Sequence, residues 1–147
     1  MLTGDAQQLA NEETLRRNME KLRHELGSVI CNALDDKEVI EIMVNPDGCI
    51  WLDRLSYGME NTKKKISPER LLAALGTIAA MLRTELNKNS PILEGELPLD
   101  GSRVEGVIPP IVKSASMSIR KHSSAVFPID RYIKERRISQ AGWNYLQ

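Results

Sequence analysis

Hydrophobic positions along the chain follow helical spacing in two segments. Apolar side chains recur every three or four residues from Glu12 to about Leu34, which predicts a long amphipathic helix. A second helical pattern begins at Pro68, with Ser67 as its capping residue, and runs to about Glu85. The first helix has the spacing that coiled-coil seams also use, so two interpretations are open. The favoured one is that its apolar face packs on a sheet of its own domain, and the other is that this face packs on a partner helix.

Other segments show the strict alternation of apolar and polar residues that is typical of strands. Residues 39–55 alternate on both sides of the turn sequence NPDG, which predicts a hairpin. Residues 57–67 predict a third strand whose three lysines, 63–65, protect a sheet edge. Three more short strands follow in ILEGELPL, SRVEGVIPP and SASMSIRK, and FPIDRYIKERRI begins a last helix. This order predicts an α+β fold with one mostly antiparallel sheet of about six strands, flanked by helices.

Two of the predicted strands each place an arginine on the polar side. If the strands pair about a loop centred between Ile111 and Val112, every apolar residue of one meets an apolar residue or glycine of the other, and Arg103 lies opposite Arg120. A slip by one residue would place apolar against polar positions, so the two arginines share the solvent face.

Adjacent guanidinium groups repel each other, so this arrangement needs a compensating negative charge. Glu94, Glu96 and Glu105 alternate onto nearby polar faces and could form a surface ion network. An anionic ligand is the other possibility, because the planar guanidinium group suits phosphate. Spacing alone favours the ion network and leaves the ligand open.

Length and composition restrict the classes of function. A chain of 147 residues is the size of one domain, and we expect a flexible N-terminus at 1–11, a folded domain at 12–138 and a linker at 139–147. Net charge is zero and only 4% of residues are aromatic, which argues against direct binding of nucleic acid. The chain lacks both a long apolar run and a signal-peptide pattern, so we expect a cytoplasmic protein.

Motifs for chemistry within this sequence are few. No GxxxxGK[ST] phosphate-binding loop occurs, so we expect no ATP hydrolysis by this chain alone and no catalytic residue. His24 and His122 lack metal-ligand spacing and are expected to lie at the surface. Cys31 and Cys49 form no CxxC motif, so we expect reduced thiols and no metal site.

Three motifs together resemble the N-terminal domain of the traffic ATPases of type IV secretion, of the conjugal-transfer TrbB type. They are VNPDG followed by IW and DR, the strand GSRVEGVIPP, and the strand SIRK, and the similarity extends in order from Val39 to about Ile138. The superfamily includes the motors of type II secretion and type IV pili. The resemblance implies a curved, PAS-like sheet, followed in the family by a RecA-like ATPase domain to which residues 139–147 would lead.

The resemblance also implies function. It suggests a part of a hexameric ATPase that binds ATP between its two domains, with magnesium held by the C-terminal domain, and that works with secretion components at the inner membrane. The phosphate-contacting roles fall on Arg103 and Arg120, with Lys121 as a weaker candidate. A non-enzymatic interaction or ligand-sensing module stays open as the alternative.

Overall fold

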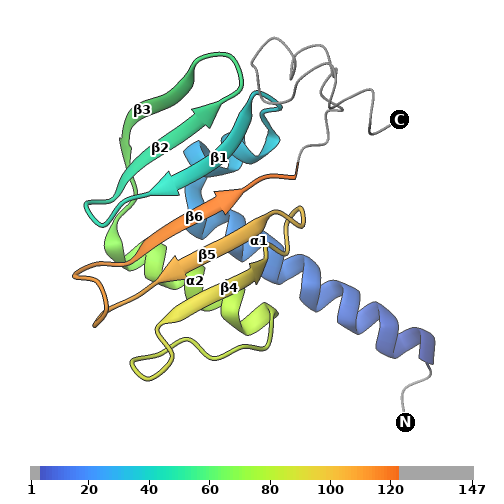
Figure 1. The fold of residues 1–147 in the computed structure, drawn as a ribbon. Coiled ribbons are helices and arrows are strands. Elements are labelled where there is room, and N and C mark those ends of the chain that lie inside the picture. The colour runs from blue at the N-terminus through green and yellow to red at the C-terminus, as the bar shows by residue number, and fades with distance from the viewer. Residues whose placement is uncertain (1–3, 123–147) are drawn as a thin grey trace, which may run out of the picture.

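The computed structural model describes residues 4–122, which form two helices and six strands (Figure 1). All strand pairs are antiparallel, which confirms the predicted α+β class. The predicted C-terminal helix and the linker at 139–147 lie outside the described residues. In chain order the elements are α1 (Gly4–Asp35), β1 (Val39–Val44), β2 (Cys49–Arg54), β3 (Gly58–Lys65), α2 (Pro68–Met81), β4 (Ile92–Glu96), β5 (Arg103–Val107) and β6 (Ser116–Arg120).

The sheet consists of two three-stranded units joined at its centre. Its strand order is β3-β2-β1-β6-β5-β4, so the first and last strands of the described chain are neighbours. Both helices lie on one face of this sheet, while the opposite face carries no helix of the described part of the chain (Figure 1). Alternate residues of every strand therefore point either into the core or onto this open face.

The hairpin between β1 and β2 has the turn that the NPDG sequence predicts. Gly48 has φ +85°, and a Cβ at this position would come within 2.6 Å of the carbonyl oxygen of Ile66, so only glycine fits. The carboxylate of Asp47 accepts a hydrogen bond of 2.8 Å from the backbone N–H of Cys49.

Helix α2 begins as predicted and ends earlier. The hydroxyl of Ser67 accepts a hydrogen bond from the backbone N–H of Arg70, with Pro68 in the first helical turn. The helix ends at Met81, because Arg83 has the left-handed φ of 55° and interrupts the helical backbone. The apolar pattern continues past this point because Leu82 and Leu86 pack on the core from the following segment.

Helix α1 is longer than predicted and is broken. It begins at Gly4, so residues 4–11 are helical where a flexible segment is predicted. Side-chain hydrogen bonds one turn apart support these exposed turns, from Gln7 to Asn11 at 3.2 Å and from Gln8 to Glu12 at 3.3 Å. Hydrophobic spacing cannot reveal turns that bury nothing.

The break in α1 lies at Gly27, whose φ of 86° and ψ of 170° interrupt the helix. The guanidinium group of Arg70 in α2 donates a hydrogen bond to the carbonyl of His24 just before the break. Thr77 of α2 donates to the carboxylate of Glu25 at 2.6 Å, so these polar contacts join the two helices in addition to their apolar contact.

The core lies between the helices and the sheet. The C-terminal half of α1 contributes Leu22, Leu26, Ile30 and Ala33 to it, which confirms that this half packs on its own domain, whereas Leu9 and Leu15 are exposed. Both helices and the sheet contribute side chains that are less than 2% exposed. The largest are Leu22, Ile30, Ile42, Ile50, Leu71, Leu75, Ile78, Leu93, Leu97 and Ile119.

Candidate functional site

The arginine pair lies where the alternation of the two strands places it. In the β5–β6 ladder Arg103 is directly opposite Arg120, and the neighbouring pair is Val104 with Ile119. The two aliphatic residues are fully buried beneath the helices, whereas the arginine side chains are 60% and 72% exposed. The structure therefore confirms the predicted register and the shared open face.

A small hollow lies between the two guanidinium groups. It has a volume of about 80 Å³, and its lining adds Glu105 and Ser118 to Arg103 and Arg120. A neighbouring hollow of about 320 Å³ shares Glu105 and Ser118 and extends toward β1. Its wall is more apolar and includes Met43, Pro46, Val107 and Met117. The open face thus joins a cationic recess to an apolar one.

Among residues 4–122, each arginine has one carboxylate as an ion-pair partner, at long range. The Nε atom of Arg103 lies 3.5 Å from Glu105, and the Nη2 atom of Arg120 lies 4.0 Å from Glu41. Charge-assisted hydrogen bonds are usually about 2.7–2.9 Å long, so both guanidinium groups are loosely held. Much of their hydrogen-bonding capacity faces solvent.

Only part of the predicted carboxylate network forms. Glu105 contacts Arg103 as expected. Glu96 is opposite Arg103 in the backbone ladder, and Glu94 is opposite Glu105, yet no ion pair joins Glu94 or Glu96 to either arginine within residues 4–122. Sequence reasoning missed Glu41, which reaches the site because β1 pairs with β6 far along the chain.

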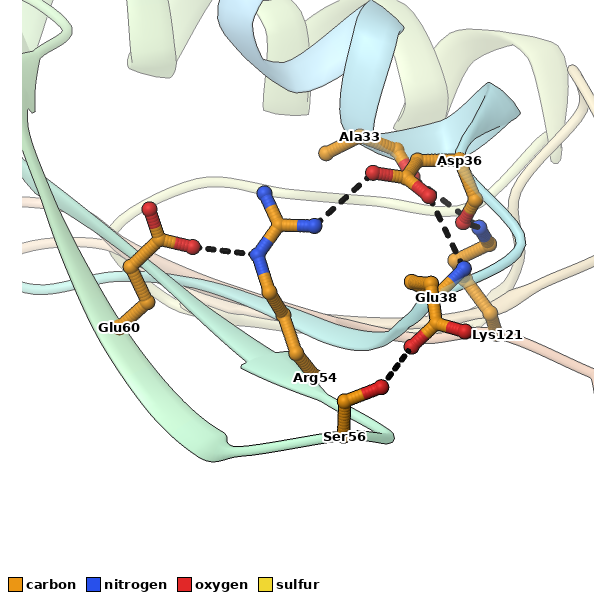
Figure 2. A network of polar contacts seen from close by, with 7 residues as sticks. All are labelled: Ala33, Asp36, Glu38, Arg54, Ser56, Glu60 and Lys121. Atoms are coloured by element: carbon orange, nitrogen blue, oxygen red, sulfur yellow. Dashed lines mark hydrogen bonds and ion pairs between the residues drawn. The ribbon is translucent and has the colours of Figure 1, made fainter.

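Lys121 does not join the arginine pair. As the residue after Arg120, it turns toward the other side of the sheet, and its ammonium group donates hydrogen bonds to the carbonyls of Ala33, at 3.0 Å, and Asp36 (Figure 2). Burial lowers the pKa of Lys121. The structure therefore corrects its predicted role, because this amine binds the C-terminal end of α1.

The same end of α1 is joined to β2 and β3 by a second charged group. Arg54, whose side chain is only 19% exposed, donates to Asp36 at 2.9 Å and also to Glu60 (Figure 2). A hydrogen bond from the backbone N–H of Glu38 and another from Arg54 lower the pKa of Asp36. This network connects elements and faces away from the arginine pair.

Other candidate chemistry is absent from the described part of the chain. Residues 4–122 contain no cluster of histidine, cysteine or acidic groups that could hold a metal ion. Cys31 and Cys49 are free cysteines. No helix between residues 4 and 122 is long and apolar enough to cross a membrane.

Comparison with known proteins finds conjugal transfer proteins among the curated sequences. No family model matches the chain. Over 125 residues, 85% of this chain, it is 38% identical to the probable conjugal transfer protein TrbB of Sinorhizobium fredii and to the conjugal transfer protein TrbB of Rhizobium radiobacter. The chain spans about two fifths of the length of these relatives, since the match covers 38% of each.

A solved structure shares the fold. The VirB11 ATPase from the type IV secretion system of Brucella suis, crystallised with sulphate, superposes with a TM-score of 0.69 and 22% identity, over 87% of this chain and 38% of that one. The predicted resemblance is thereby confirmed. Over most of its length this chain is similar to the TrbB conjugal transfer proteins, and it shares its fold with part of the VirB11 ATPase.

Proposed function

We propose that this chain is the nucleotide-contacting and ring-forming N-terminal domain of a hexameric ATPase that powers type IV secretion, conjugative DNA transfer or pilus assembly. The observation that carries the proposal is the direct pairing of Arg103 with Arg120 on the sheet face that carries no helix of residues 4–122. The similarity to TrbB supports the system, and the partial coverage of TrbB supports a domain of a longer protein.

In this proposal the arginine pair binds the phosphates of ATP, while magnesium and the hydrolytic groups belong to a RecA-like C-terminal domain. Bonds between guanidinium and phosphate exist only while the phosphate is present. ATP binding would therefore draw the domain toward the nucleotide, and hydrolysis would release it. The assembly would act in the cytoplasm, at the periphery of the inner membrane, with other secretion components.

The first test is turnover with ATP and magnesium. We expect none from the chain, because its sequence contains no phosphate-binding loop. A measurable kcat from the purified chain would contradict the proposed division of labour.

The second test uses a full-length protein that carries this domain. Replacing Arg103 or Arg120 with alanine should raise KM for ATP or lower kcat at least about tenfold, because each removes a charge-assisted contact. Arg17→Ala is the matched control, since Arg17 is 71% exposed on α1. Unchanged ATPase parameters in both variants would favour the alternative, an interaction or ligand-sensing module in which Glu41 and Glu105 are the arginines' permanent partners.

A further inference from the structure

A row of charged side chains crosses the open face and contains the arginine pair. The ladders place Asp53 opposite Glu41, Glu41 opposite Arg120, Arg120 opposite Arg103, and Arg103 opposite Glu96. The two positive charges therefore lie between acidic residues at both ends. A phosphate that enters this row meets two guanidinium groups and the negative field of the neighbouring carboxylates.

The arginines of this row are held differently from the structural arginine of the same domain. Arg54 is mostly buried and makes a 2.9 Å contact to Asp36 as well as its bond to Glu60. Arg103 and Arg120 are mostly exposed, and their carboxylates lie at 3.5 and 4.0 Å. Long ion pairs with an exposed arginine contribute little to stability, so a phosphate can compete with either carboxylate for its guanidinium group.

Glu41 differs from Glu105 because its side chain is held at the site and cannot easily turn away into solvent. Its side chain is 22% exposed, against 52% for Glu105, and its carboxylate accepts a hydrogen bond of 3.4 Å from the hydroxyl of Ser118. When Arg120 turns to a phosphate, Glu41 remains at the site beside Asp53 and the incoming anion. Its repulsion then opposes binding.

We propose that Glu41, with Glu105 as a weaker partner, is a built-in counter-ion that competes with phosphate for the arginine pair and thereby sets the affinity of the site. The inference rests on the proposed function, because it concerns the same two arginines. The carboxylates neutralise the pair when no phosphate is bound, and they favour release of phosphate. Glu41 is thus an affinity-determining residue, although it does not bind the ligand.

The experiment measures binding of inorganic tripolyphosphate to the purified chain by titration calorimetry, at low and at raised salt. Glu41→Gln removes the charge and keeps the shape, and we expect it to bind about three- to tenfold more tightly than the parent chain. Glu105→Gln should strengthen binding less, because Glu105 is more exposed. Glu85→Gln, an exposed residue beyond α2, has the same change of charge and should leave the affinity unchanged. The differences should shrink at raised salt.

The outcomes separate this inference from the proposed function. Suppose that Arg103→Ala and Arg120→Ala abolish binding while Glu41→Gln and Glu105→Gln bind like the parent chain. The inference then fails and the phosphate site stands. If neither the parent chain nor any variant binds tripolyphosphate, both fail for this chain. Should Glu41→Gln fold poorly, as a melting curve would reveal, a Glu105→Gln variant no tighter than Glu85→Gln overturns the inference by itself.

Discussion

Substitutions at the adjacent residues Arg120 and Lys121 should affect different properties, phosphate binding in the first case and stability in the second. Arg120 lies on the open face, whereas the ammonium group of Lys121 binds the carbonyls of Ala33 and Asp36 at the end of α1. We expect Arg120→Gln to weaken binding of tripolyphosphate and leave the fold intact. We expect Lys121→Met to destabilise the fold and leave binding unchanged.

The size of each effect follows from the contacts. A hydrogen bond to a charged group contributes about 1.5–3 kcal/mol, and Lys121 makes two. Burial of the ammonium group offsets part of this stabilisation. In the variant each carbonyl would also keep a backbone hydrogen bond, because the N–H of Asp36 donates to the carbonyl of Ala33 and the N–H of Val39 donates to the carbonyl of Asp36. A net loss of about 1–2 kcal/mol is therefore expected for Lys121→Met, or roughly 3–10 °C in Tm. Arg120→Gln should change stability by less than about 0.5 kcal/mol, because the side chain is 72% exposed and opposite another arginine.

The assay combines urea unfolding with titration of tripolyphosphate for both variants. Arg120→Gln should weaken binding about tenfold or more, the equivalent of one charge-assisted contact. The reasoning is refuted if Lys121→Met unfolds like the parent chain, or if it loses affinity as much as Arg120→Gln does. The second result would return Lys121 to the phosphate-contacting role that the family resemblance implies.

Two further predictions concern packing and acid stability. A Cβ on Gly106 would come within 2.6 Å of the fully buried Leu75, so Gly106→Ala should lower the free energy of unfolding in urea by about 1–3 kcal/mol. A Cβ on Gly95 would come within 2.7 Å of Leu82, which is only partly buried and can move aside, so Gly95→Ala should lower it less. Equal losses for the two variants would contradict the packing argument. The pKa of Asp36 is lowered in the folded state, so its contribution to stability is present above the unfolded pKa of about 4 and is lost as pH falls through the lower folded pKa. Asp36→Asn should therefore reduce the loss of Tm between pH 5 and about 3, and a slope identical to that of the parent chain would show that Asp36 is not responsible.

Much of the fold was predictable because local patterns agree with it. The turn at Gly48, the cap at Ser67 and the alternation of β5 and β6 each depend on residues close in sequence. The start of α1 and the end of α2 were less predictable. Residues 4–11 form a helix through polar pairs, and α2 ends at a left-handed Arg83, and neither feature alters the apolar spacing.

The candidate site divides in the same way. The sequence by itself determined that Arg103 and Arg120 share one face, because a strand alternates with period two and a slipped register would expose the core. Only the tertiary structure decided their neighbours. Glu41 reaches Arg120 through the β1–β6 pairing, and Lys121 finds carbonyls at the end of α1, both over long separations in the chain. Alternation fixes which way a side chain points, whereas the order of strands and the position of a helix determine what it meets.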